Sequence, residues 1–220
     1  MAASGLGRSP MLSCALLCAI AALAGEVIAE TENTLTRQSV YGTELKKCDR
    51  TAYMAAHPEA ADKKFPVTGF ARDNLCGSHT GDGGSHYVCA VLPSSTTSAG
   101  GPYSEFWTKT GQARSGEEAV TWPKPGPWCI CMWAFARMYG NNPEFSEMLD
   151  CSATNYWVVQ KYDINKPAEC RALAAVCNRC DLQNSTLTKR EGIQKKCEQA
   201  QQLCPSEASA ETCTVEGGCQ

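Results

Sequence analysis

The sequence predicts an α+β protein, made of a small mixed domain with a buried helix and a C-terminal helical hairpin stapled by disulfides. Two short runs that favour β-strands, at 86–92 and 156–162, flank an apolar run at 128–139 that favours a buried helix. Four later cysteines recur at helical spacing and predict the hairpin. A short apolar N-terminal segment precedes all but two of the 15 cysteines, which indicates a chain that folds where disulfides form.

The first 24 residues have the pattern of a secretory signal peptide. Arg8 supplies a positive charge, residues 11–24 are almost wholly apolar, and small residues end the run at Ala22 and Ala24. The apolar run is shorter than the about 20 residues that span a bilayer. We therefore expect cleavage after Ala24, a secreted or endomembrane-lumen location, and no membrane span after cleavage. A retained signal anchor is the alternative.

Composition divides the rest of the chain into three parts. Residues 25–47 form a polar N-terminal segment, 48–166 a cysteine-containing α+β domain, and 167–220 a cysteine-rich helical hairpin with a tail. The last boundary falls near Lys166 because Pro167 interrupts the chain there and no aromatic residue occurs beyond it.

The charge balance limits the class of partner. The net charge is −3 and the pI is about 5.7, whereas a general nucleic-acid binder would carry a basic stripe. We expect an unidentified protein or small-molecule ligand and no nucleic acid.

Turn residues delimit the elements of the main domain. The strand at 86–92 lies between a glycine-rich turn and a proline. A short helix is expected within 103–110. Gly126 and Pro127 predict the N-cap and the first residue of the buried helix. That assignment places Cys129 in the first helical turn.

The hairpin prediction depends on cysteine spacing. Cys170 and Cys177 are seven residues apart, as are Cys197 and Cys204. Seven residues are almost two helical turns, so each pair lies on one face of a helix. Two such helices joined by a short polar loop must be antiparallel. This geometry predicts the disulfides Cys170–Cys204 and Cys177–Cys197.

A glycosylation triplet, Asn184-Ser185-Thr186, falls in the loop between these helices. An exported chain with such a triplet in a surface loop is a substrate for N-glycosylation, so we expect a glycan on Asn184.

The main domain contains six further cysteines, and we expect these to pair among themselves in disulfides. They are Cys48, Cys76, Cys89, Cys129, Cys131 and Cys151. This arrangement needs no cofactor. Because 15 − 2 = 13 cysteines follow the signal segment, at least one of them is expected to lie outside an intramolecular disulfide.

Two alternatives use the same thiols for chemistry. A zinc-type site would draw its ligands from Cys76, His86, Cys89, Cys129 and Cys131. A reactive thiol would be Cys129, stabilised as a thiolate at the start of the predicted helix, with His86 as its base.

Three motifs of the main domain occur together in a known family. They are Thr68-Gly69-Phe70-x-Arg72-Asp73, Gly84-Ser85-His86-x-Val88-Cys89-Ala90-Val91 and Trp128-Cys129-x-Cys131. This combination, over roughly 48–159, resembles the uncharacterised domain of unknown function family 2237 of bacteria and microbial eukaryotes. Members of that family have a histidine where this chain has Asn155. The family has no established activity, so the resemblance implies no mechanism.

The resemblance bears on the choice between these alternatives. Relatives without export signals would keep the matched cysteines reduced, and such thiols more often bind metal or react. Trp107, Trp122 and Trp128 are candidates for lining a ligand groove. We expect a non-catalytic binding or interaction module of unknown molecular function. The alternative is a zinc- or thiol-dependent enzyme that uses the cysteine and histidine cluster.

Overall fold

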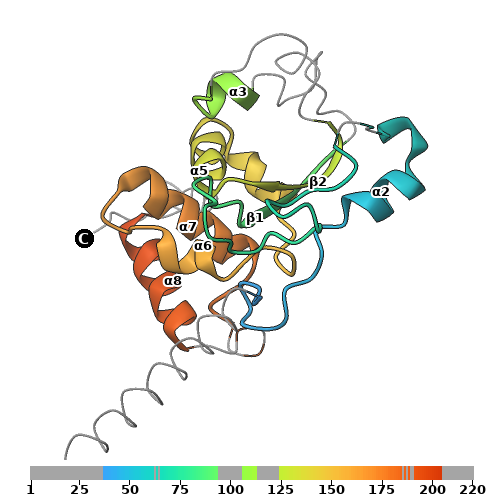
Figure 1. Cartoon of the computed structure of the whole chain (residues 1–220). Coiled ribbons are helices and arrows are strands. Elements are labelled where there is room, and N and C mark those ends of the chain that lie inside the picture. The colour runs from blue at the N-terminus through green and yellow to red at the C-terminus, as the bar shows by residue number, and fades with distance from the viewer. Residues whose placement is uncertain are drawn as a thin grey trace, which may run out of the picture. The chain divides into compact units, whose positions relative to one another are not determined.

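The structure is a computed structural model of the whole chain (Figure 1). It describes residues 37–61, 63, 65–93, 106–112, 124–184, 186, 188 and 191–204. All of these belong to one compact unit, Thr36–Gln220. The predicted signal peptide, the polar segment up to residue 36, Cys213 and Cys219 lie outside the described residues.

A two-stranded antiparallel sheet lies in the centre of the described part of the fold. Strand β1 is Val88–Leu92 and strand β2 is Gly126–Ile130, with Cys89 directly opposite Cys129. The predicted strand at 86–92 is confirmed in β1. The prediction that a helix begins at Gly126 and Pro127 is wrong, because 126–130 is fully buried strand. A short apolar run fits a buried strand as well as a buried helix, and pairing with β1 decides between them.

Helix α5, Met132–Asn141, follows β2 directly and confirms the rest of the predicted buried helix. Cys131 is its N-cap residue. Phe135 is fully buried and packs against Phe145 of the 3-10 helix η2, Pro143–Met148. The predicted short helix within 103–110 is confirmed as α3, Phe106–Lys109, which contacts α5. Helix α5 packs against α7 and η2.

The second predicted strand, at 156–162, is wrong. This segment contains helix α6, Trp157–Lys161. The buried Asn155 side chain begins the turn, because its Oδ1 accepts the N–H of Trp157 at 2.9 Å. This local side-chain turn precedes the helix and overrides the β preference of the Trp-Val-Val run.

The C-terminal hairpin has the predicted form. Helices α7, Pro167–Arg179, and α8, Glu191–Leu203, pack against each other and carry the disulfides Cys170–Cys204 and Cys177–Cys197. Helix α7 also packs against α5, so contacts continue across Lys166. A third disulfide, Cys151–Cys180, fastens the end of α7 to the main domain.

Two short helices complete the described elements. Helix α2, Arg50–Ala56, contacts β2, and the 3-10 helix η1, Pro58–Ala60, follows it. None of the helices in the described residues combines the length and the apolar character needed to cross a bilayer.

Candidate active site

The disulfides of the main domain differ from the prediction at two cysteines. Two bridges, Cys48–Cys89 and Cys76–Cys129, join predicted members of the set. Cys151 instead pairs with Cys180 beyond the predicted boundary, because the turn at Asp150–Cys151 lies against the end of α7. Cys131 is the cysteine of the described residues that stays outside a disulfide. The prediction that all six pair among themselves is therefore wrong.

The predicted zinc-type set is divided between two places. Cys76, Cys89 and Cys129 lie with Cys48 in one buried cluster, where they form the two bridges. His86 and Cys131 contact each other instead, with 3.3 Å between Nε2 and Sγ. These five residues consequently do not form a single ligand shell in this structure.

A tight loop before β1 positions the histidine. The side chain of Asp82 is almost fully buried, and its Oδ2 accepts the backbone N–H of His86 at 2.9 Å. The Oδ1 atom accepts the N–H of Gly84 at 3.1 Å and the Nδ1–H of His86 at 2.7 Å. Ser85 has a φ of 49°, a left-handed turn conformation that brings these groups together. The loop fixes the orientation of the imidazole and directs Nε2 away from the carboxylate.

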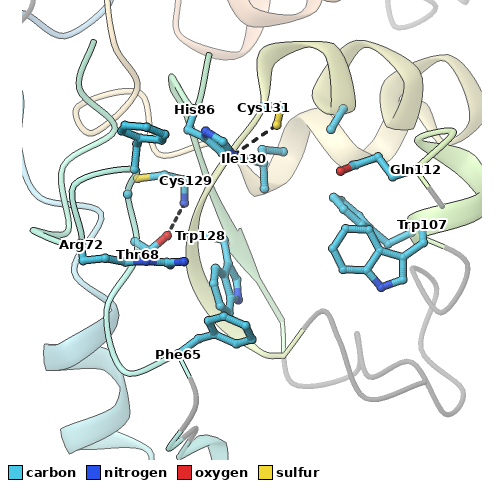
Figure 2. Close-up of a pocket in the computed structure, with 14 residues that line it drawn as sticks. Phe65, Thr68, Arg72, His86, Trp107, Gln112, Trp128, Cys129, Ile130 and Cys131 are labelled. Atoms are coloured by element: carbon cyan, nitrogen blue, oxygen red, sulfur yellow. Dashed lines mark hydrogen bonds between the residues drawn. The ribbon is translucent and has the colours of Figure 1, made fainter. Parts of the chain in front are cut away.

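The cysteine comes from the junction of β2 and α5. The backbone at Cys131 is extended, with φ −58° and ψ 137°, and the helix begins at the next residue. The N–H of Met132 donates to the carbonyl of Ser85 at 3.0 Å, which ties the helix start to the histidine loop. Cys131 is partly exposed, whereas Cys129 is buried in its bridge to Cys76. Figure 2 shows the Cys131 sulfur beside the imidazole of His86.

The electrostatics of this pair favour an imidazolium. The pKa of His86 is raised from 6.5 to about 9, and its largest cause is the hydrogen bond with Cys131, which outweighs the opposing effect of burial. The hydrogen bond and the charge of Asp82 contribute further in the same direction. At neutral pH His86 is therefore protonated, and a cationic imidazole 3.3 Å from the sulfur attracts a thiolate.

Gly84 provides the space for this contact. A Cβ atom at this position would lie 2.5 Å from Cε1 of His86 and 3.0 Å from Sγ of Cys131. Any larger residue would therefore displace the imidazole or the sulfur. The glycine of the Gly-Ser-His motif is explained by this close approach.

The start of α5 supplies further positive potential. Cys131 is the N-cap residue, and its side chain makes no cap hydrogen bond to the N–H groups of the first turn. These N–H groups and the helix dipole favour negative charge at the sulfur and on a nearby substrate oxygen.

A cavity of about 440 Å³ opens beside the pair. This volume is within the range of about 300–1,000 Å³ that small-molecule sites occupy. His86, Cys131 and Ala134 are among the residues that line it. Aromatic side chains form much of the remainder, as Figure 2 shows for several of them; the aromatic lining residues are Phe65, Phe70, Phe106, Trp107 and Trp128.

Buried contacts hold the aromatic wall in place. The guanidinium of the fully buried Arg50 lies 4.0 Å from the ring centre of Trp128. The same side chain donates to the carbonyls of Phe65 and Pro125, at 2.9 Å each. The Phe65 and Trp128 rings meet edge to face at 5.9 Å. This wall is preformed, because both rings are fixed by contacts behind the cavity.

Arg72 adds a positive charge to the cavity lining. Its guanidinium lies over the Phe65 ring at 5.6 Å. Among the described residues no carboxylate forms an ion pair with it. The Asp73 side chain instead accepts the N–H of Leu75 at 3.0 Å within the turn. A guanidinium so placed can bind a negative group on a ligand.

Sequence reasoning identified His86 but assigned the wrong thiol to it. The predicted pairing with Cys129 is wrong, because the helix begins five residues later than expected and Cys129 is in a bridge. The role of Asp82 was not predicted. The signal that could have found it is an aspartate four residues before a histidine, with glycines between them.

The other residues singled out in the sequence are divided between the cavity, positions away from it and residues outside the described part of the chain. Asn155 is buried beside the sheet, where its N–H donates to the carbonyl of Tyr87, and it does not line the cavity. Trp107 and Trp128 line the cavity, whereas Trp122 lies outside the described residues. Asn184 lies in a hairpin turn and accepts the hydroxyl of Thr186 at 2.6 Å.

No family model matches the sequence, and no curated protein matches it. The resemblance to the domain of unknown function family 2237 therefore stays a prediction.

Proposed function

We propose that this protein is a thiol-dependent enzyme that transfers or hydrolyses acyl groups. In this proposal Cys131 is the nucleophile, His86 its acid and base, and Asp82 the group that orients the imidazole. One observation carries it: a sulfur 3.3 Å from Nε2 of a histidine whose Nδ1–H is held by a buried carboxylate, at the edge of a cavity. Nucleophile, base and orienting acid in this relation are the elements of a catalytic triad.

The chemistry follows from these contacts. The Cys131 thiolate attacks a carbonyl carbon, and the first-turn N–H groups of α5 stabilise the oxygen that becomes negative. The Nε2–H of the His86 imidazolium gives its proton to the leaving group, so that group departs neutral and a thioester remains on Cys131. Water then attacks the thioester while His86 takes up its proton. Release of the carboxylic acid restores the thiolate–imidazolium pair.

The lining of the cavity indicates the kind of substrate. Five aromatic side chains favour an apolar or aromatic group, which aromatic side chains bind by stacking and by burying area. Arg72 favours a negative group elsewhere on the same molecule. A small ester, thioester or amide of an aromatic acid fits both features.

Activity assays test this proposal directly. The substrates are chromogenic esters and thioesters of aryl-substituted acids, with and without a second carboxylate. Cys131→Ala should abolish turnover, and His86→Ala should lower it by about 10²-fold or more. His57→Ala is the matched control, because His57 is exposed and does not line the cavity. Turnover that survives Cys131→Ala would exclude the triad.

A non-catalytic binding role remains the competing proposal. The same cavity would then hold a ligand without reaction. Intact-mass measurement during turnover separates the two proposals, because only the enzyme forms an acyl adduct on Cys131. Reversible binding that is equally tight in Cys131→Ser, with no adduct and no product, would favour the binding module.

The cellular setting is proposed with the function. Five disulfides among the described residues are compatible with folding in an oxidising compartment. They support the proposal that residues 1–24 are a signal peptide and that the protein is secreted or lumenal. The hydrogen bonds that the Asn184 side chain makes with Asp181 and Thr186 lie at the surface. This surface position supports the proposal of a glycan on Asn184. N-terminal sequencing of protein from an exporting eukaryotic cell would test the cleavage site.

A further inference from the structure

Two disulfides meet in the core of the main domain, although their cysteines come from four separate segments. Cys89 of β1 and Cys129 of β2 lie directly opposite each other in the sheet. Cys48 precedes α2, and Cys76 follows the turn that contains Gly69 and Arg72. All four side chains are buried, with exposures of 0% to 6%, and Ala153 packs with them.

The sheet register explains why the sulfurs converge. The N–H of Cys89 donates to the hydroxyl of Thr154 at 3.1 Å, and the N–H of Cys129 donates to the hydroxyl of Thr68 at 2.9 Å. Neither N–H is directed at the opposite strand, so Cys89 and Cys129 form a non-hydrogen-bonded pair. The side chains of such a pair lie on the same face and close together.

The distances between the bridges are short enough for shared coordination. The Sγ atoms of Cys48, Cys76 and Cys89 all lie within 4.8 Å of one another, although Cys76 is bonded to neither of the other two. Its own partner, Cys129, is 2.09 Å away. In a zinc tetrathiolate the Zn–S distance is about 2.3 Å, which places the sulfurs about 3.8 Å apart. The Cys129 Sγ does not lie within 4.8 Å of all three, so its side chain must move toward the Cys48–Cys89 bridge before the four sulfurs can form one tetrahedral shell.

We propose that Cys48, Cys76, Cys89 and Cys129 form a tetrathiolate site for Zn²⁺ when their two disulfides are reduced. The site would hold the β1–β2 pair, the segment before α2 and the loop at Cys76 together in a reducing environment, as the disulfides do in an oxidising one. The site uses none of the residues of the proposed triad. It can therefore be tested independently of the enzymatic proposal.

The conversion balances with a phosphine as the reductant. Each disulfide takes two electrons from one phosphine, which becomes the phosphine oxide with its oxygen from water, and the two sulfurs take up two protons. One Zn²⁺ then displaces the four protons from the four thiols. Because the site is buried, zinc enters while the reduced chain folds.

The hairpin offers an internal control for the proposal. Its bridges Cys170–Cys204 and Cys177–Cys197 lie seven residues apart along each helix, a rise of about 10 Å. Reduction frees four thiols there as well, but those two pairs are too far apart to share one ion. The pair of substitutions Cys177→Ala and Cys197→Ala therefore matches Cys48→Ala and Cys89→Ala in the number of thiols removed.

The test is metal binding by the reduced full-length chain. The chain is unfolded and reduced with a phosphine without oxygen, refolded with Zn²⁺ or Co²⁺ and desalted. We expect about one metal ion per chain, a Co²⁺ spectrum typical of four thiolates, and protection of the four core cysteines from alkylation. Cys48→Ala with Cys89→Ala should lower the bound metal at least about tenfold, whereas Cys177→Ala with Cys197→Ala should retain it.

Several results would overturn the proposal. Refolded wild-type chain without stoichiometric metal, or with all of its thiols alkylated in the presence of zinc, excludes the site without reliance on any variant. Metal binding that persists when Cys48→Ala and Cys89→Ala are combined would also exclude the site. Loss of metal in Cys131→Ala or His86→Ala would assign the ion to a different ligand set.

Discussion

Replacing Cys131 with alanine removes the group that contributes most to the raised pKa of His86. With a pKa of about 9, the imidazole of the wild-type protein is about 97% protonated at pH 7.5. Without the sulfur, the pKa should fall back toward 6.5, where about 10% of the imidazole is protonated at the same pH. The Asp82 contact contributes less than the sulfur, so Asp82→Asn should lower the pKa by a smaller amount.

NMR titration of the imidazole Cε1–H signals measures this change. The chain has three histidines, so His57→Ala and His79→Ala assign the remaining signal to His86. We expect a midpoint near 9 in the wild-type protein and a much lower one in Cys131→Ala. A wild-type midpoint near 6.5, or no change in Cys131→Ala, would refute the thiolate–imidazolium pair. If the pKa of His86 fell further in Asp82→Asn than in Cys131→Ala, the carboxylate and not the sulfur would be the larger cause of the raised pKa.

The same shift predicts how stability depends on pH. The folded protein holds the His86 proton more tightly than the unfolded chain, whose histidine has a pKa near 6.5. The stability that His86 contributes is therefore complete below pH 6.5 and is lost as the pH rises to about 9. Urea midpoints measured across this range should decline in the wild-type protein, and the decline should be smaller in Cys131→Ala.

Three further substitutions separate the site from the scaffold. Gly84→Ala should slow alkylation of Cys131 by about 10²-fold, because its Cβ would lie 3.0 Å from the sulfur; an unchanged rate would show that the pair tolerates the methyl group. Removing the Cys177–Cys197 bridge, which closes a separation of 20 residues, should lower the free energy of unfolding by about 3 kcal/mol in urea titrations, and a loss well under 1 kcal/mol would contradict its role as a staple. Asn184→Gln should abolish an endoglycosidase-sensitive mass shift in protein from an exporting eukaryotic host, and equal masses for both forms would exclude the glycan.

The hairpin was predictable because its geometry is local. Cysteines seven residues apart fix one face of each helix, and a short loop fixes the antiparallel direction. Both bridges follow from these facts alone. By contrast, the Cys151–Cys180 bridge depends on how α7 packs against the main domain, and no local pattern carries that information.

The errors in the main domain share a physical cause. Short apolar runs fit a buried strand and a buried helix equally well, and tertiary partners decide between them. Pairing with β1 makes 126–130 a strand, and the turn formed by the Asn155 side chain leads into helix α6. Moving the helix start from Pro127 to Met132 transfers the N-cap position to Cys131. The identity of the proposed nucleophile therefore depended on one element boundary.

Alkylation kinetics of the non-reduced protein test the central claim, that Cys131 is a nucleophile activated by His86. Iodoacetamide is added at pH 7, and peptide mapping follows each cysteine in the wild-type protein, His86→Gln and His57→Gln. We predict that Cys131 is labelled in the wild-type protein and in His57→Gln at similar rates, and at least about tenfold more slowly in His86→Gln. A Cys131 that is found in a disulfide, or that reacts equally fast without His86, would contradict the account.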